Sequence, residues 1–217
     1  MQDTGTTVRS VVFDLEGTLV DFQWRLAEAE SELRQAFAAL GYGTAGNYAQ
    51  LWNTAAGIAR ERGELDALRR ALGPVYDRWD ADALARWSLR ADVVELFDVL
   101  ADRGTRMALV SNIGRTALDS LLQRFGLQGR LAPTISRDEV IRMKPDAEGV
   151  LRALADLGAR PEDSLFVGDS RADVRAARAV GMPVAIIRGG ECSEADFADD
   201  PPDHFITGLM EIASLAA

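Results

Sequence analysis

The sequence predicts an α/β protein with a parallel sheet covered by helices on both faces and an all-helical unit inserted after the first strand. The apolar, β-branched run at residues 11–13 ends in two carboxylates, Asp14 and Glu16, which is typical of a buried strand with charge at its C-terminal tip. From residue 91 onward, strand-like and helix-like segments alternate, which is typical of a parallel sheet. Between about residue 21 and about residue 88, the sequence pattern predicts helices throughout.

The stretch after the first strand predicts a site for a cation and a phosphate. Alternate residues of an extended chain point the same way, so a bend at the strand end would let Asp14 and Glu16 face one pocket while Gly17 permits a tight turn. Because the two acids have no cation nearby in the sequence, we expect a hard divalent cation and a phosphate held by it as their partners.

The composition indicates a globular enzyme. The chain has 217 residues, of which 47% are hydrophobic and 27% charged, so it can bury a full core. Its formal net charge of −10 argues against binding to the phosphate backbone of nucleic acids. No apolar run approaches the roughly 20 residues of a membrane span, and residues 1–7 do not resemble a signal peptide. We therefore expect a cytoplasmic enzyme without nucleic-acid or membrane partners.

The single cysteine and the single histidine exclude several kinds of site. Cys192 alone cannot form an intrachain disulfide or a cysteine-based metal cluster, and it lies in a loop without a nearby histidine. His204 alone removes histidine-rich zinc sites, and its neighbours predict the start of a strand. We assign neither residue to the chemistry.

The region after the first strand is expected to be a cap of several helices. Helix formers with apolar residues at helical spacing predict helices over 24–40, 47–62, 64–72 and 75–89. The expected division is a core of residues 1–20 and 89–217 and a cap of residues 21–88.

Three tryptophans of this region leave the oligomeric state open. Trp52, Trp79 and Trp87 can pack internally or against a second subunit. A monomer and a homodimer are therefore both compatible with the sequence.

The second half of the chain predicts the alternating elements of the core. Apolar runs predict strands over 106–110, 133–136, 164–167, 183–187 and 205–206. Helix-forming segments predict helices over 91–102, 115–125, 147–157, 172–180 and 209–215. Such alternation gives right-handed crossovers and a functional site at the carboxyl ends of the strands.

Four short polar segments fall at strand ends or beside helix starts. They are residues 14–18, Ser111-Asn112, Lys144-Pro145, and Gly168-Asp169 with Asp173. Each segment alone is common, since a Ser-Asn pair is a frequent turn and a Gly-Asp pair most often caps a helix. In this order, and spread over essentially the whole chain, they resemble the haloacid dehalogenase superfamily. The resemblance implies a Rossmann-like three-layer core, and the helical insertion looks like the family's C1-type cap.

The resemblance implies a covalent phosphatase mechanism. Asp14 corresponds to the nucleophile, which attacks phosphorus to form an aspartyl-phosphate that water then hydrolyses. Glu16 stands where the family has the general acid that protonates the leaving alkoxide and later serves as the base for water. Asp169, with Asp14 and the main-chain carbonyl of residue 16, would hold Mg²⁺. Asp173 would orient a metal-bound water or bind the ion directly.

The resemblance also implies the groups that bind phosphate. The Ser111 hydroxyl and the Asn112 main-chain N–H would contact phosphoryl oxygens. Lys144 would supply positive charge to these oxygens and to the Asp14 carboxylate. Thr18 would use its hydroxyl or its backbone in the turn after the nucleophile.

The cap is expected to select a small phosphorylated metabolite by closing over Asp14 and excluding water. Trp24 and Arg25, just after the first strand, and Asn53 and Arg60 are candidates for the pocket. A core position is favoured for Trp24, and a solvated helix end is favoured for Arg60. Arg25 is our candidate for contact with the substrate.

Glu16 departs from the family pattern, which usually has aspartate at this position. The extra methylene moves the carboxyl by about 1.5 Å, a displacement that affects rate unless the site accommodates it. Some phosphatase-like members of the superfamily carry glutamate here, whereas dehalogenase-like members carry an aromatic residue and phosphonatase-like members a small one. An acid at this position therefore favours cleavage of a phosphoester.

The sequence predicts a Mg²⁺-dependent phosphatase that hydrolyses a small phosphomonoester through an aspartyl-phosphate on Asp14. A sugar phosphate or a phosphoglycolate-like metabolite is the expected substrate. Two alternatives stay open. One is a phosphomutase of the β-phosphoglucomutase type, which has the same cap class. The other is a weakly active or inactive scaffold that acts as a binding module because of Glu16.

Overall fold

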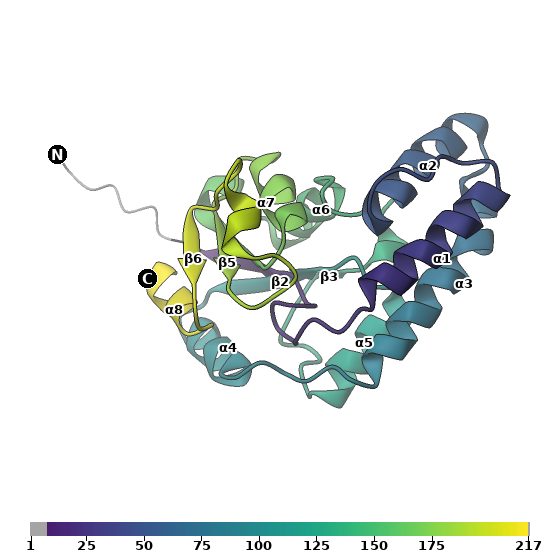
Figure 1. Ribbon diagram of the computed structural model, residues 1–217. Helices are drawn as coiled ribbons and strands as arrows, with labels where there is room; N and C mark the ends of the chain where they lie inside the picture. Colours follow the sequence, from purple (N-terminus) through teal and green to yellow (C-terminus); the bar gives the residue numbers. More distant parts are fainter. Residues whose placement is uncertain (1–7, 217) are drawn as a thin grey trace.

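A parallel sheet of six strands forms the centre of the molecule (Figure 1). The computed structural model describes residues 8–216. The strands lie in the order β3-β2-β1-β4-β5-β6, and each neighbouring pair is parallel. Their bounds are β1 Ser10–Phe13, β2 Arg106–Val110, β3 Thr134–Ile135, β4 Ser164–Gly168, β5 Val184–Ile187 and β6 His204–Ile206. The expected α/β class with a parallel sheet is confirmed.

Helices cover both faces of this sheet, because successive side chains of a strand point to opposite sides. Val11 and Phe13 pack into the apolar cluster that contains α4, α5 and α8, whereas Val12 packs with α6 and α7 on the other face (Figure 1). These helices are α4 Val93–Asp102, α5 Arg115–Arg124, α6 Glu148–Leu157, α7 Arg171–Arg178 and α8 Glu211–Leu215. Short 3-10 helices lie in the loops at Arg137–Glu139, Pro161–Asp163 and Glu194–Phe197. The expected three-layer core is confirmed.

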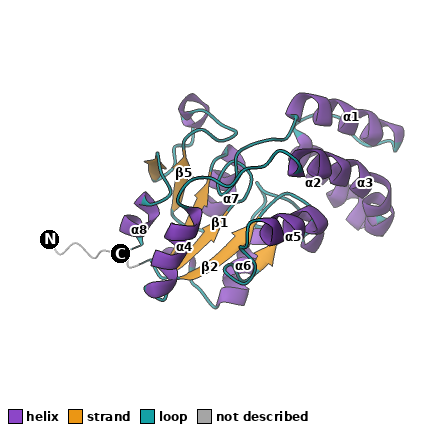
Figure 2. Cartoon of the chain, turned by 90° about the horizontal axis from the view of Figure 1, so that it is seen from below, coloured by secondary structure: helices purple, strands orange, loops and turns teal. Residues whose placement is uncertain are grey.

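Three further helices stand together, apart from the strands (Figure 2). They are α1 Leu26–Ala39, α2 Tyr48–Arg62 and α3 Leu65–Leu84. The side chain of Asn47 accepts a hydrogen bond from the main-chain N–H of Gln50. In return, the side chain of Gln50 accepts a hydrogen bond from the main-chain N–H of Asn47, so a capping box begins α2. The residues from 26 to 84 therefore form an all-helical unit at one end of the sheet.

One prediction for this unit is wrong. We expected two helices, over 64–72 and 75–89, but a single helix α3 runs through Pro74 and ends at Leu84. Leu72 and Tyr76, on either side of the proline, are both buried in the same apolar cluster. This packing outweighs the one hydrogen bond that a proline removes from a helix interior.

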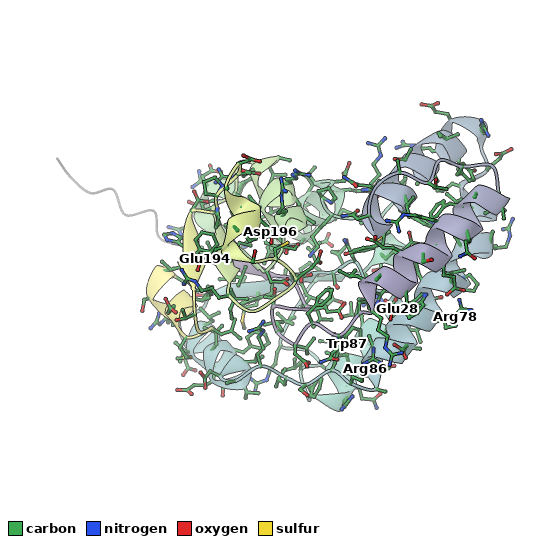
Figure 3. All side chains as sticks on the ribbon, in the orientation of Figure 1. Glu28, Arg78, Arg86, Trp87, Glu194 and Asp196 are labelled. Carbon is green, nitrogen blue, oxygen red and sulfur yellow. The ribbon has the colours of Figure 1, made fainter. Side chains whose placement is uncertain are left out.

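Two short connections join the helical unit to the sheet and lie against each other. Val20 in the first pairs with Leu89 in the second as an isolated antiparallel bridge. Trp87, labelled in Figure 3, is fully buried in the second connection. The expected boundary between core and cap lies at residues 20 and 89, where Val20 and Leu89 pair. This division into two domains stays a prediction.

The tryptophans of the helical region pack within the chain. Trp52 and Trp87 are buried, and the half-buried Trp79 donates a hydrogen bond from its indole nitrogen to Glu32 over 2.9 Å. They present little apolar surface to a second subunit.

Across residues 8–216, each helix is too short or too polar to cross a membrane. The expectation that the first seven residues form no signal peptide concerns a segment outside the described residues.

Candidate active site

Three buried carboxylates meet at the carboxyl edge of the sheet. Asp14 directly follows β1, and its main-chain N–H donates to Val167 of β4 over 2.8 Å. Asp169 directly follows β4, and Asp173 lies in the first turn of α7. One oxygen from each of the three carboxylates lies within 4.8 Å of the others. Parallel strands that end side by side therefore bring together acids that are up to 159 positions apart (173 − 14).

Lys144 binds two of these acids at once. Its Nζ donates to Oδ1 of Asp14 over 2.5 Å and to Oδ1 of Asp173 over 2.7 Å. The lysine is only 4% exposed. Burial opposes its charge, but the carboxylates of Asp14 and Asp173 outweigh burial and raise the pKa of Lys144, so the ammonium stays charged.

One ammonium does not balance three buried acids. Burial, partly offset by Lys144 and increased by Asp173, raises the pKa of Asp14 to about 6. Burial and the charges of Asp14 and Asp173 raise the pKa of Asp169 well above its usual range. Buried carboxylate oxygens this close, with excess negative charge, are the donor set that a hard divalent cation takes. The residues present thus fit such an ion.

Asp169 is held from two sides. The Thr18 hydroxyl donates to its Oδ1 over 3.2 Å, and the main-chain N–H of Glu191 donates to its Oδ2 over 2.5 Å. Gly17 has φ +85°, and a Cβ at that position would lie 2.0 Å from Oδ2 of Asp169. The turn therefore requires glycine for both its backbone angle and its space.

Thr18 lies outside the pocket that it was expected to line. It was expected to contact phosphate, but it is fully buried and does not line the pocket. The turn at Gly17 directs its hydroxyl to Asp169, because main-chain bonds from residues 18–20 to Leu15 fold this segment back on itself. Thr18 is thus a positioning residue for Asp169.

Asp173 fixes the loop that carries Asp169. Its Oδ2 accepts the main-chain N–H groups of Asp169 and Ser170, over 3.1 and 3.0 Å, and the Ser170 hydroxyl over 2.7 Å. Its Oδ1 holds Lys144. Asp173 therefore caps α7 and links this helix to the lysine.

Glu16 is anchored by groups from both connections to the helical unit. Its Oε1 accepts the main-chain N–H groups of Gln23 and Trp24, over 2.9 and 2.8 Å, and the indole N–H of Trp87 over 2.9 Å. Burial outweighs these three donors and raises the pKa of Glu16 to about 8. The carboxyl is therefore protonated at neutral pH and has a proton to donate.

Ser111 and Asn112 follow β2 and line the same pocket as the acids. The side chain of Asn112 accepts the main-chain N–H of Lys144 over 3.0 Å and donates to its carbonyl over 3.1 Å. It also donates to the hydroxyl of Tyr48 over 3.2 Å. Asn112 thus fixes the backbone of the lysine and contacts the helical unit.

A pocket of about 440 Å³ opens above these groups. Besides the acids, Lys144 and the Ser111 loop, the first connection, α1, α2 and the start of α7 contribute to its wall. The residues are Phe22, Trp24, Leu26, Tyr48, Ser170, Ala172 and Glu191. Trp24, for which a core position was favoured, is buried and also lines this pocket.

Arg25 was expected to contact the substrate, but it lies outside the pocket. It does not line the pocket; its guanidinium lies 3.8 Å from Asp82 and is largely exposed. Asn53 does not line the pocket either, because its amide pairs with both the N–H and the carbonyl of Met143, each over 2.8 Å. Arg60 is exposed on α2. Successive residues at the start of a helix are rotated by about 100° from one another, so closeness to the first strand did not decide which side chain enters the pocket.

Several residues at or beside the site were not predicted from the sequence. Asp80 of α3 and Arg137 form an ion pair of 3.0 Å that is almost fully buried between the helical unit and the core. Asp80 also accepts the indole N–H of Trp24 over 3.1 Å. Glu191 and Tyr48 line the pocket, and neither was among the site residues predicted from the sequence. No local pattern marks any of these residues, since their partners are distant in the sequence.

Comparison with known proteins gives one consistent result. The family model of haloacid dehalogenase-like hydrolases matches residues 8–181. Phosphoglycolate phosphatase 1 of Pseudomonas aeruginosa is 30% identical, over 96% of this chain and 79% of its own length. The plasmid-encoded phosphoglycolate phosphatase of Cupriavidus necator is 32% identical, over 95% of this chain and 92% of its own. A crystal structure of a HAD-superfamily hydrolase of subfamily IA from Geobacter sulfurreducens superposes with a TM-score of 0.61 at 20% identity, covering 100% of both chains.

Proposed function

Because the chain belongs to the haloacid dehalogenase-like hydrolase family and is a phosphoric monoester hydrolase, we propose that it cleaves a small phosphomonoester through an aspartyl-phosphate on Asp14. The observation that carries this proposal is the meeting of Asp14, Asp169 and Lys144 at one strand edge, beside Glu16, whose pKa is raised by burial. The names of the relatives make phosphoglycolate one candidate substrate, with sugar phosphates as others.

The proposed cofactor is Mg²⁺. The carboxylates of Asp14, Asp169 and Asp173 and the main-chain carbonyl of Glu16 are its proposed ligands. When bound, it would supply positive charge to the phosphoryl oxygens. The excess of buried negative charge at the three acids supports this assignment.

In the first step, Asp14 attacks phosphorus. Lys144 holds Oδ1, which leaves Oδ2 to form the new bond to phosphorus while the bond from phosphorus to the leaving oxygen breaks. The proton of Glu16 passes to that leaving oxygen, so an alcohol departs. The three donors on Oε1 leave Oε2 for this transfer.

In the second step, the ionised Glu16 accepts a proton from water as the water oxygen attacks phosphorus. The bond between phosphorus and Asp14 breaks, inorganic phosphate leaves, and both acids return to their starting states. Lys144, the Ser111 hydroxyl and the main-chain N–H of Asn112 are the proposed donors to the phosphoryl oxygens throughout.

The test is turnover of p-nitrophenyl phosphate and of a panel of metabolite phosphates, with Mg²⁺ and with EDTA. We expect EDTA to abolish turnover and Asp14→Asn to lower it by at least about 1,000-fold. Asp156→Asn is the matched control, because Asp156 is an exposed residue of α6 outside the pocket. Turnover that survives EDTA or the loss of Asp14 would overturn the proposal.

The same assays separate the two alternatives. Slow hydrolysis with fast isomerisation of a hexose phosphate would identify a phosphomutase. If the wild-type protein is inactive and Glu16→Asp alone brings turnover to phosphatase levels, the chain is a binding scaffold.

A further inference from the structure

Apart from the groups proposed for catalysis, the wall of the pocket that would receive the leaving group is largely apolar and carries one further acid. Phe22, Trp24, Leu26 and Ile113 contribute apolar surface, Tyr48 and Ser170 contribute hydroxyls, and Glu191 contributes a carboxyl. Among the described residues that line the pocket, Lys144 is the only one with a positively charged side chain.

Lys144 is not available to a leaving group. Its Nζ is bound to Asp14 and Asp173 at the phosphoryl end of the pocket, and the residue is 4% exposed. In the proposed function this ammonium serves the phosphoryl oxygens and the nucleophile.

The arginines that lie close in the sequence to pocket residues do not line the pocket. Arg25 faces Asp82 outside the pocket. Arg171 and Arg175 line a neighbouring surface hollow, which shares Tyr48 and Glu191 with the pocket, but neither arginine lines the pocket itself. A short leaving group held in the pocket therefore meets no free cation there.

From this charge pattern we infer that the pocket selects phosphomonoesters with an uncharged leaving group and disfavours a leaving group that carries a carboxylate. A carboxylate that leaves water for an apolar wall needs a cationic or hydrogen-bonding partner, and a neighbouring acid adds repulsion. Among the described residues that line the pocket, Glu191 is the one acid outside the proposed catalytic and metal-binding groups. The inference rests on the proposed function, and it distinguishes this chain from relatives whose names specify phosphoglycolate.

Two substrates that differ only at the leaving group test this inference. 2-Phosphoglycolate ends in a carboxylate, and 2-hydroxyethyl phosphate has a neutral hydroxymethyl group in its place. We expect kcat/KM of the wild-type enzyme with Mg²⁺ to be at least about tenfold higher for 2-hydroxyethyl phosphate. An equal or higher value for 2-phosphoglycolate would overturn the inference.

Variants locate the source of the selectivity. Glu191→Gln should narrow the ratio between the two substrates. Glu194→Gln is the matched control from the same loop, because Glu194, labelled in Figure 3, pairs with Arg188 and lies outside the pocket. A ratio that moves with Glu194 and not with Glu191 would count against this assignment. A selective loss of 2-phosphoglycolate turnover in Arg171→Gln would show that the neighbouring hollow recruits the carboxylate, and would also overturn it.

A failure of this inference can be told apart from a failure of the proposed function. Hydrolysis of p-nitrophenyl phosphate without preference between the two test substrates refutes only the selectivity. If no phosphate ester is turned over, calorimetry with two phosphonates decides the selectivity without chemistry. 3-Hydroxypropylphosphonate should then bind more tightly than 3-phosphonopropionate, and the reverse order, or binding of neither, overturns the inference.

Discussion

The indole nitrogen of Trp87 donates a hydrogen bond to Oε1 of Glu16 over 2.9 Å. The same oxygen accepts main-chain N–H groups of Gln23 and Trp24. Trp87 lies in one connection between the helical unit and the core, and residues 23 and 24 lie in the other. The position of the proposed proton donor therefore depends on both connections, and a glutamate is accommodated where the family usually has the shorter aspartate.

Replacing Trp87 by phenylalanine tests this anchoring. Trp87→Phe keeps most of the buried ring and removes one N–H donor, so we expect kcat/KM for an alkyl phosphate to fall by about tenfold. The lost donor normally lowers the pKa of Glu16, so the alkaline limb of the pH–rate profile should also move to higher pH. Trp79→Phe, which removes a donor to Glu32 instead, should leave both quantities unaltered.

The pH dependence of the rate should report on Glu16. Its pKa is raised to about 8, and the proton on Glu16 is required by a poor leaving group, so kcat/KM for 2-hydroxyethyl phosphate should fall as the pH rises through about 8. Glu16→Gln should lower kcat/KM for 2-hydroxyethyl phosphate by about 100- to 10,000-fold and remove the alkaline limb of the pH–rate profile. The loss should be much smaller for p-nitrophenyl phosphate, whose leaving group departs without protonation. Equal losses for both esters would contradict a role of Glu16 as an acid.

The raised pKa of Glu16 also predicts how the stability of the fold depends on pH. The pKa of Glu16 is higher in the folded chain than its usual 4.5, so the folded state binds more protons between pH 4.5 and about 8. Its contribution to the free energy of unfolding therefore decreases as the pH rises across this window. Glu16→Gln should flatten the decline of the melting temperature between pH 5 and pH 8. An unchanged slope in this variant would argue against a buried, protonated Glu16.

Binding of the cation should be visible in the melting temperature. Mg²⁺ at about 100 times its dissociation constant should add about 2.7 kcal/mol to the free energy of unfolding, which corresponds to roughly 5–10 °C for a chain of this length. Asp169→Asn should abolish most of this increment, because it removes one of the three clustered carboxylates. Asp156→Asn should retain it. An increment that is the same in Asp169→Asn and in the wild type would exclude this site as the place of binding.

The buried ion pair between α3 and the core should dominate the docking of the helical unit. Arg137→Met leaves Asp80 buried without its cation, and we expect it to cost about 3–5 kcal/mol of the free energy of unfolding. Arg130→Met breaks the exposed pair with Asp98 and should cost less than about 1 kcal/mol. Denaturant titration measures both. The double variant Asp80→Asn with Arg137→Met should recover part of the loss, and equal costs for the two single variants would contradict the importance of burial.

The position of the site at the strand ends was predictable because the strand pattern is local, whereas the pairing of Asp14 with Asp169 was implied by the family resemblance. Asp14 and Asp169 each follow an apolar run directly, and parallel strands end at one edge, so periodicity predicted that both acids lie at this edge. The same local reasoning failed for α3, where the breaker Pro74 is overridden by packing on both sides. It failed again for Thr18 and Arg25, whose side chains point to Asp169 and Asp82 and not to the pocket.

The sequence by itself determined the α/β class, the helical insertion and the four polar segments that carry the chemistry, because hydrophobic period and strand-end residues are properties of neighbours along the chain. Only the tertiary structure decided which partner each group meets. Lys144 bridges Asp14, 130 positions away, and Asp173, 29 positions away, and Trp87 reaches Glu16 across 71 positions. The charge on the pocket wall likewise depends on Glu191, which enters only when a loop folds over Asp169. Contacts of this kind follow from how the helical unit and the sheet pack in space, and no spacing along the chain specifies them.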